Sequence, residues 1–360
     1  MIRIGRGVAF AVAAMAAPVS AQDAPDERIS SDGQLRLDGV EVPLSSFMSE
    51  EGRDYLRRII LDKPFGRPAS DIAAERARQD EIMAGFLDPM RRRYAVNVAE
   101  DRIAGIVVDV VTPADGVAPE NSDLVLINVH GGGFVTGARS ASLVESVPLA
   151  ALMKIKVVSI DYRMGPEHQF PAASEDVAAV YRELLKSYRP SQIGLYGCSA
   201  GGLLTAQSIA WFLEQDLPLP AAIGVFCASF GPFGGGDSGA LAGPLNGILP
   251  AIEPGPAGGA PPSYGPGYLD DAKLDDPLAY PAASQELLAA LPPTLFISGT
   301  RSFEFSAALD SHNRLTRAGV KSRFHGWDGM FHGFIYNSEL PESREAYAIM
   351  ADFFRAHLAD

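Results

Sequence analysis

Short runs rich in valine and isoleucine alternate with longer helical patterns along most of this 360-residue chain. The segments between the runs carry apolar residues at three- and four-residue spacing, which is typical of helices that cover a sheet. Strands separated by helices form a parallel sheet that is covered on both faces. We therefore predict an α/β fold with a mostly parallel central sheet and helices on both faces. The expected strands are residues 106–111, 123–130, 156–162, 193–197, 221–228, 294–300 and the weaker 322–327, and the expected helices are residues 142–154, 174–188, 202–215 and 306–319.

Two amphipathic patterns, residues 49–63 and 71–94, precede the first strand with no strand pattern between them. We predict that residues 22–95 form an N-terminal helical cap and that residues 96–360 form the α/β domain. Within that domain, residues 231–267 hold twelve glycines and eight prolines. Such a composition is unsuited to a regular helix or strand, so this segment is predicted to be a lid or the rim of a pocket.

The N-terminus has the pattern of a secretory signal peptide. Arg3 and Arg6 precede an apolar run at residues 7–19, and small residues stand just before Gln22. We predict that residues 1–21 are removed and that the mature protein is exported, to the periplasm or the medium. An uncleaved anchor is the alternative. The run is short for a bilayer span, which needs about 20 apolar residues, so stable membrane insertion is not expected.

Charge and cysteine content limit the partners and the covalent framework. The formal net charge is -14, and it becomes -16 once Arg3 and Arg6 are removed. Such a surface repels nucleic acid and anionic lipid. With only Cys198 and Cys227 in the chain, a disulfide framework is excluded, while one bridge between them stays open. The sequence also leaves a homo-oligomer open.

A Gly-Cys-Ser-Ala-Gly sequence at residues 197–201 stands between an expected strand and an expected helix. A tight turn of this kind exposes its central residue and requires glycine two positions away on either side. Gly197 and Gly201 satisfy this requirement around Ser199, whereas a turn centred on Cys198 would place Tyr196 and Ala200 there. Ser199 is therefore predicted to be a nucleophile, and Cys198 its neighbour.

Three consecutive glycines, Gly131, Gly132 and Gly133, follow His130 at the end of another expected strand. Such a loop lets backbone amides point into a cleft, where together with the amide of Ala200 they can stabilise an oxyanion. A flexible turn or a phosphate-binding loop is the alternative. The phosphate version needs a Lys-Ser/Thr pair or a G-x-G-x-x-G spacing that is absent from this loop.

Four motifs together resemble a known family. HGGGF, DYRMGPEHQFPAASEDV, GCSAGG and DGMFHGF are similar to motifs of the hormone-sensitive-lipase-like branch of the α/β-hydrolases, which includes many bacterial carboxylesterases. The resemblance implies the α/β-hydrolase fold and a serine carboxylesterase acting on small-molecule esters with short to medium acyl chains, without a metal or an organic cofactor. Lactone or amide hydrolysis with the same residues stays open. The resemblance also implies that five residues brace the HGGG loop: Asp161, Arg163, Pro166, Glu167 and His168.

The base and the acid follow from chain order, because the histidine of an α/β-hydrolase comes after the nucleophile and the acid. His332 stands in that place, between the last strand and the C-terminal helix. Related enzymes carry an aspartate where this chain has Ser302, so we predict Glu304, two residues later, as the acid. Asp328, Asp310 and the lack of any acid are the alternatives.

The missing aspartate also supports a different class of function. A protein of this fold that has lost part of its triad can bind a small molecule without hydrolysing it. The presence of His332 favours the enzyme, and an esterase assay distinguishes the two.

Overall fold

The computed structural model describes residues 39, 41–62, 69, 71–247 and 267–358. Leu44–Asp360 form one compact unit, which carries every helix and strand given below, and the few described residues before Leu44 belong to a separate unit, Met1–Pro43. The predicted signal peptide, residues 1–21, lies outside the described residues.

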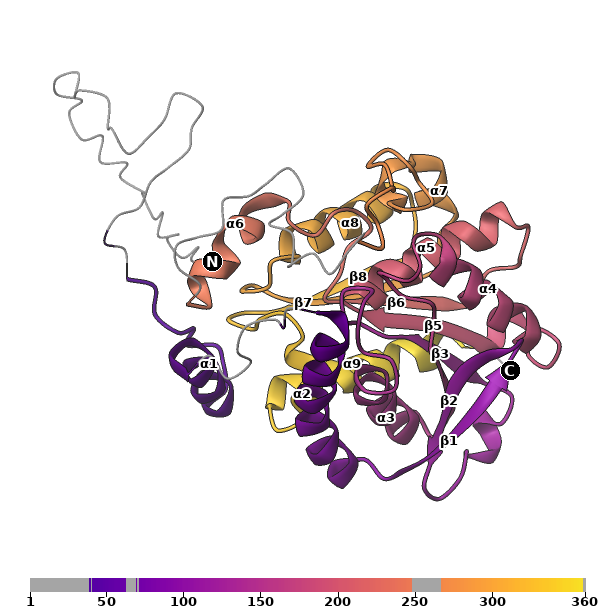
Figure 1. The fold of residues 1–360 in the computed structure, drawn as a ribbon, viewed down its shortest axis with the longest axis horizontal. Coiled ribbons are helices and arrows are strands. Elements are labelled where there is room, and N and C mark those ends of the chain that lie inside the picture. The colour runs from indigo at the N-terminus through magenta and orange to yellow at the C-terminus, as the bar shows by residue number, and fades with distance from the viewer. Residues whose placement is uncertain (1–38, 40, 63–68, 70, 248–266, 359–360) are drawn as a thin grey trace, which may run out of the picture. The chain divides into compact units, whose positions relative to one another are not determined.

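Eight strands in the described part of the chain form one sheet, in the order β1-β2-β4-β3-β5-β6-β7-β8. Strands β3 to β8 run parallel, whereas β2 pairs antiparallel with both β1 and β4 at one edge. The predicted mostly parallel α/β sheet is thereby confirmed (Figure 1). The strands are β1 (Val96–Ile103), β2 (Ile106–Pro113), β3 (Val125–Val129), β4 (Lys156–Ile160), β5 (Ile193–Cys198), β6 (Ala222–Phe226), β7 (Thr294–Gly299) and β8 (Ser322–Trp327).

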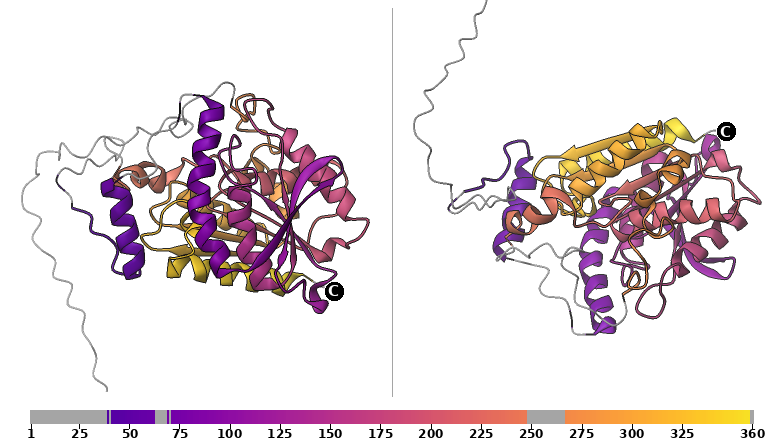
Figure 2. Two further views of the ribbon diagram at one scale, coloured as in Figure 1. Left: turned by 60° about the horizontal axis from the view of Figure 1, so that its bottom comes forward. Right: turned by 90° about the horizontal axis from the view of Figure 1, so that it is seen from above.

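Helices cover both faces of the sheet, as predicted (Figures 1 and 2). Helices α3 (Ala141–Met153) and α9 (Pro341–His357) pack on one face. Helices α4 (Ala172–Leu184), α5 (Ala200–Glu214) and α8 (Phe305–Arg317) pack on the other, together with the short α7 (Gln285–Ala290). Among the described residues, four short 3-10 helices lie between the longer elements: η1 (Pro119–Asn121), η2 (Pro190–Gln192), η3 (Pro281–Ala283) and η4 (Phe334–Tyr336).

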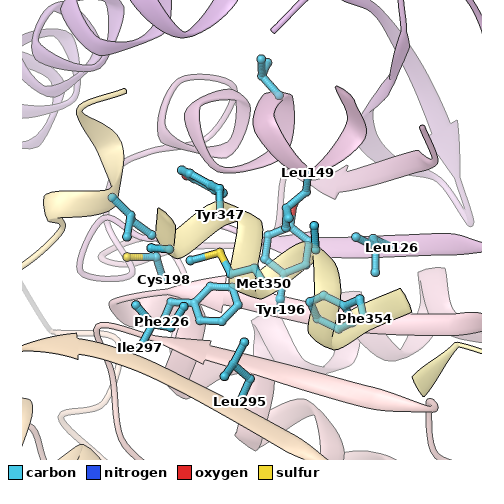
Figure 3. Close-up of a cluster of buried hydrophobic side chains, with 14 of the residues drawn as sticks. Leu126, Leu149, Tyr196, Cys198, Phe226, Leu295, Ile297, Tyr347, Met350 and Phe354 are labelled. Atoms are coloured by element: carbon cyan, nitrogen blue, oxygen red, sulfur yellow. The ribbon is translucent and has the colours of Figure 1, made fainter. Parts of the chain in front are cut away.

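Successive side chains of a strand point to opposite faces of the sheet and so contribute to the two hydrophobic cores, one on each face. In β3 every residue is buried, and Leu126 contributes to the core under α3 and α9 while Val125 and Ile127 contribute to the opposite one. A strand buried on both faces needs such a continuous apolar run. Figure 3 shows Tyr347, Met350 and Phe354 of α9 against side chains of the strands, and each large apolar side chain buried in this way stabilises the fold by about 1.5–3 kcal/mol.

The two helices predicted ahead of the sheet are present as α1 (Glu50–Asp62) and α2 (Ile72–Arg93). Asp71 caps α2, since its side chain accepts a hydrogen bond of 3.0 Å from the amide of Ala74. The basic last turn of α2, residues 91–93, suits the negative end of the helix dipole. Helix α2 lies beside α3 (Figure 2).

Three features of the fold differ from the sequence prediction, and one of them is the short helix α7, which was not predicted. Strand β1 was not predicted, because it is an edge strand with mostly exposed, polar side chains that lack an apolar pattern. The prediction that residues 231–267 hold no regular structure is wrong in part, since α6 (Gly236–Leu245) is helical there. Contacts with the loop before α8, described below, hold this helix despite its glycines. Residues 248–266 of the predicted lid lie outside the described residues.

Within the described residues, every helix is too short or too polar to cross a lipid bilayer.

Candidate active site

Ser199 stands at the sharp turn between β5 and α5. Its φ of 57° lies in the left-handed region, which is strained for a residue with a side chain. A Cβ added to Gly197 or Gly201 would lie 2.1 Å or 1.9 Å from the carbonyl oxygen of Val129. Both flanking glycines are therefore required by the close passage of β3, and the predicted nucleophile turn is present at Ser199.

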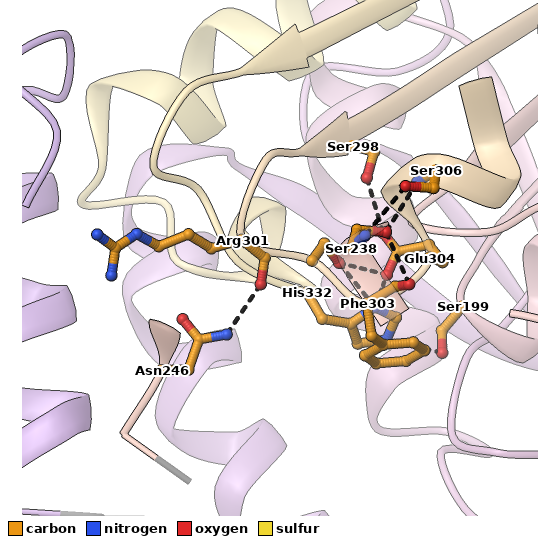
Figure 4. A network of polar contacts seen from close by, with 10 residues as sticks. Ser199, Ser238, Asn246, Ser298, Arg301, Phe303, Glu304, Ser306 and His332 are labelled. Carbon is orange, nitrogen blue, oxygen red and sulfur yellow. Dashed lines mark hydrogen bonds and ion pairs between the residues drawn. The ribbon is translucent and has the colours of Figure 1, made fainter. Parts of the chain in front are cut away.

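His332 reaches Ser199 from the loop between β8 and η4. Its Nε2 atom lies 2.9 Å from the Ser199 Oγ atom, although the two residues are 133 positions apart in the sequence. The ring of Phe303 stacks on the imidazole, with ring centroids 4.4 Å apart. The contact with Phe303 restricts the orientation of the imidazole (Figure 4).

Glu304, at the start of α8, lies on the other side of the imidazole. Its Oε2 atom is 2.9 Å from Nδ1 of His332, and its side chain is fully buried. The two alternative acids, Asp328 and Asp310, interact with other residues. Asp328 accepts hydrogen bonds from Ser45 and from Thr300, and Asp310 forms a salt bridge of 2.6 Å with Arg314. The structure thus brings Ser199, His332 and Glu304 together and leaves Asp328 and Asp310 out.

Two serine hydroxyls hold the Glu304 carboxylate. Ser298 donates to Oε1 over 2.8 Å, and Ser302 donates to Oε2. Burial acts to raise the pKa of Glu304, but the neighbouring His332 and the Ser302 hydroxyl outweigh it, so the pKa lies below its ordinary value of 4.5. Ser302, where the family resemblance predicts an aspartate, therefore helps to hold the carboxylate of Glu304.

Cys198 takes no part in this arrangement. Its side chain is fully buried in the core shown in Figure 3, and burial raises the pKa of its thiol well above the ordinary value. Cys227, at the end of the neighbouring strand, is also buried, and both thiols are free. A buried thiol with a raised pKa is a poor nucleophile, in agreement with the assignment to Ser199.

The glycine loop approaches Ser199 as expected, but one of its predicted donors is engaged elsewhere. The amide of Gly131 donates a hydrogen bond of 2.9 Å to Oε1 of Glu145, so the prediction that it faces an oxyanion is wrong. The amides of Gly132, Gly133 and Ala200 have no acceptor within the described part of the chain. These three amides are available for an oxyanion.

Side chains from neighbouring segments brace this loop. Tyr162 donates a hydrogen bond of 2.7 Å to the carbonyl of His130, and the two rings stack at 4.3 Å. Arg76 of α2 donates to the carbonyl of Val135 and pairs with Glu167 at 2.7 Å. Glu167 thus contacts this loop through Arg76, a residue that was not predicted from the sequence. Arg163, which was predicted to brace the loop, instead forms salt bridges with Asp176 and Glu175 of α4.

Helix α6 is tied to the loop that carries Glu304. Ser238 Oγ donates to the carbonyl of Phe303 over 3.0 Å and accepts from the amide of Ser306 over 2.8 Å. At the other end of the helix, Asn246 donates to the carbonyl of Arg301 over 2.8 Å (Figure 4). These contacts link part of the glycine- and proline-rich segment to the position of the acid.

Comparisons with known proteins agree with this fold. Residues 126–336, more than half of the chain, match the family described as having the alpha/beta hydrolase fold. The chain belongs to this family. The match includes Ser199, Glu304 and His332 and the glycine loop.

Curated relatives of this α/β-hydrolase cover most of its length. It is 31% identical over 281 residues to an acetyl-hydrolase of Streptomyces hygroscopicus, covering 75% of this chain and 90% of the relative. It is 26% identical over 261 residues to an esterase of Acinetobacter venetianus, covering 72% of this chain and 82% of that protein.

Solved structures extend the comparison. The crystal structure of an esterase superimposes with a TM-score of 0.74 at 28% identity, covering 91% of this chain and 99% of that one. An esterase from the bacterial hormone-sensitive lipase family gives a TM-score of 0.73 at 26% identity, covering 86% and 99%. The resemblance to hormone-sensitive-lipase-like bacterial esterases is confirmed.

Two residues of the site escaped the sequence reasoning. Glu145 stands in α3, whose residues from Ala141 to Ala150 are all buried, and Tyr336 follows His332 by four positions. A carboxylate in such an apolar helix is a signal, because a buried charge needs specific partners. Its partners come from distant segments and become visible only in the folded chain.

Proposed function

We propose that this protein is a serine carboxylesterase that hydrolyses short- to medium-chain acyl esters through an acyl-enzyme intermediate. The observation that carries the proposal is the position of His332, whose two ring nitrogens lie 2.9 Å from Ser199 Oγ and 2.9 Å from a Glu304 oxygen. Such an arrangement suits proton transfer from a hydroxyl to an imidazole that a carboxylate orients. The esterase relatives support ester hydrolysis as the reaction.

In the proposed reaction, Ser199 Oγ attacks the ester carbonyl carbon and its proton passes to Nε2 of His332. The amides of Gly132, Gly133 and Ala200 stabilise the oxyanion of the tetrahedral intermediate. The intermediate collapses, the bond to the alcohol oxygen breaks, and His332 returns the proton to the leaving alcohol. Water then attacks the acyl-enzyme with His332 as base and releases the acid and free Ser199. Glu304 orients the imidazole and stabilises its positive charge.

Hydrolysis of p-nitrophenyl acetate and butyrate by the purified protein tests the proposal. Ser199→Ala should lose nearly all turnover, whereas Cys198→Ala should keep it, because the thiol is buried among apolar side chains. Full activity in Ser199→Ala, or none in a folded Cys198→Ala, would contradict the assignment. A wild-type protein that binds these esters without turnover would instead be a binding module of the same fold. A panel of acyl chain lengths, lactones and amides defines the substrate class.

We further propose that the protein is exported after removal of residues 1–21. The motif ahead of Gln22 supports this proposal. The intact mass of the protein from the periplasm or medium checks it, since the mature chain should begin at Gln22. Recovery of the full-length chain in the membrane fraction would favour an uncleaved anchor.

A further inference from the structure

Glu145 is a buried carboxylate that the proposed mechanism does not use. It lies near the middle of α3, with 2% of its surface exposed, in a helix whose neighbouring residues are nearly all apolar or small. A carboxylate without partners at such a place would destabilise the fold by several kcal/mol. The burial of Glu145 therefore depends on the groups that its carboxylate binds.

Three donors from three separate segments converge on this carboxylate. Oε1 accepts the amide of Gly131 at 2.9 Å and the hydroxyl of Tyr336 at 2.7 Å. Oε2 accepts the side-chain amide of Asn128 at 2.8 Å, and Asn128 in turn accepts from Ser159 at 2.7 Å. The carboxylate therefore joins β3, the glycine loop and the segment that follows His332.

The place where Glu145 binds the glycine loop lies directly behind the nucleophile. A Cβ added to Gly131 would lie 2.8 Å from the carbonyl oxygen of Cys198, 2.8 Å from the Tyr336 hydroxyl and 3.3 Å from the Ser199 Cβ. The peptide at Gly131 thus packs against the nucleophile turn with no spare room. Its N–H is taken by Glu145, whereas the next two amides, of Gly132 and Gly133, have no acceptor among the described residues.

We propose that Glu145 is a positioning residue for the oxyanion-binding loop. By accepting the Gly131 N–H and the Tyr336 hydroxyl on one oxygen, it fixes the glycine loop and the segment after His332 against the turn at Ser199. It touches neither substrate nor the reacting atoms, and it acts through the orientation of the Gly132 and Gly133 amides. The inference rests on the proposed esterase function.

The size of the effect follows from the geometry that catalysis needs. A displacement of about 1 Å at a reacting centre costs about 10²-fold in rate, and loss of one oxyanion donor costs about 10²–10³-fold. Loss of the acceptor for Gly131 should therefore lower kcat rather than raise KM, because the oxyanion forms only as the reaction proceeds.

The central experiment compares Glu145→Leu with Glu145→Gln. Leucine fills the space without an acceptor, whereas glutamine keeps an oxygen that can accept from Gly131 and Tyr336. We expect Glu145→Leu to lose about 10²-fold in kcat for p-nitrophenyl butyrate with KM changed less than about threefold. Affinity for a trifluoromethyl ketone, whose adduct with a serine carries an oxyanion, should fall in parallel. Glu145→Gln should recover most of both quantities.

Catalysis in folded protein separates this role from a structural one. Glu145→Leu leaves the Gly131 amide, the Tyr336 hydroxyl and the Asn128 side-chain amide without their acceptor, so it should lower the melting temperature, since each unpaired buried donor destabilises the fold. The assays are therefore run well below the melting temperature of the variant, where the loss of kcat and of ketone affinity reports on folded protein. The buried Glu342 of α9 accepts hydrogen bonds from Ser49 instead, and Glu342→Gln is the control that should leave kcat unchanged. If Glu145→Leu does not fold, Glu145→Met serves in its place with the same expectations.

Normal kcat and normal ketone affinity in Glu145→Leu would overturn the inference, and so would a loss of kcat with no loss of ketone affinity. The Ser199→Ala variant, assayed in parallel, keeps the two proposals distinct. Turnover that depends on Ser199 but is indifferent to residue 145 counts against the role of Glu145 alone. A wild type without Ser199-dependent turnover counts against the esterase proposal, and the inference falls with it.

Discussion

Glu304 Oε2 lies 2.9 Å from His332 Nδ1, and Glu304 stands two residues beyond Ser302, where the family resemblance predicts an aspartate. The side chain of Ser302, which occupies that position, donates a hydrogen bond to the same carboxylate oxygen. The longer glutamate thus reaches the imidazole from the N-cap position of α8, and the serine hydroxyl holds its carboxylate. The site therefore has a buried carboxylate next to the histidine, although Ser302 itself carries none.

The role of Glu304 is testable by removing its charge without changing its shape. Replacing the acid of a serine protease by its amide lowers kcat by about 10⁴-fold with the geometry intact. Glu304→Gln should lose kcat on this scale in p-nitrophenyl butyrate hydrolysis, with little change in melting temperature. Ser302→Asp in the Glu304→Gln background should recover part of the activity, because Ser302 Oγ lies 3.4 Å from His332 Nδ1. Near-normal turnover in Glu304→Gln alone would show that Glu304 is not the acid.

Loss of the contact between α6 and the acid loop should reduce turnover moderately. Ser238→Ala removes the hydrogen bonds to Phe303 and Ser306, which flank Glu304 on both sides. We expect a loss of about 1 kcal/mol in stability and a fall in kcat of about fivefold. Hydrogen exchange measured by mass spectrometry should show faster exchange at the Ser306 amide. The exposed neighbour Asp237 provides the control, and equal effects in Asp237→Ala would rule out a specific contact.

The stability of the protein should depend on pH through Glu145. Burial raises the pKa of Glu145 to about 7, against the opposing hydrogen bonds from Gly131 and Tyr336. The folded protein therefore holds this proton more tightly than the unfolded chain, whose pKa is near the ordinary 4.5. The contribution is complete below about pH 4.5 and is lost as the pH rises through about 7, by about 3 kcal/mol in all.

Urea unfolding at pH 5 and pH 8 measures this contribution as a difference between the wild type and Glu145→Gln. Glutamine does not titrate, so the wild type should lose stability relative to the variant on going to pH 8. A constant difference between the two proteins across this range would contradict the raised pKa of Glu145.

Gly201 and Gly85 form a matched pair for the turn at Ser199. A Cβ at Gly201 would overlap the carbonyl oxygen of Val129, so Gly201→Ala should cost at least about 3 kcal/mol and abolish turnover. Gly85 lies exposed in α2, where an added Cβ meets no described atom within 4 Å. Gly85→Ala should instead stabilise the protein by up to about 1 kcal/mol, because alanine favours a helix. Denaturant midpoints compare the two, and tolerance of Gly201→Ala would mean that the turn is less crowded than described.

Much of the fold is specified by local patterns. The seven predicted strands are present, and six of them carry apolar runs that suit a covered sheet, whereas β8 is a weakly patterned, partly exposed edge strand. Ser199 lies where the flanking glycines indicate. The placing of His332 required only chain order. Local sequence is sufficient for these features because each depends on neighbouring residues, or on an order of elements common to the family.

Prediction from local patterns failed for elements that are held by residues distant in the sequence. Strand β1 is held by its pairing with β2 rather than by an apolar run, and α6 is held by its contacts with the loop before α8. The glycine and proline content of residues 231–267 gave no indication of the contacts that hold α6. A segment with weak intrinsic preference takes the structure that its tertiary contacts stabilise.

The same division applies to the site. By itself, the sequence determined the nucleophile turn, the histidine and the glycine loop, since each is a short motif with its own steric or chemical requirement. Only the tertiary structure decided that Glu304, rather than Asp328 or Asp310, reaches the imidazole, and that Gly131 donates to Glu145 instead of facing a substrate. The physical reason is that a hydrogen bond extends about 3 Å in space and is independent of sequence separation, so residues far apart in the chain become partners only when the sheet brings them together.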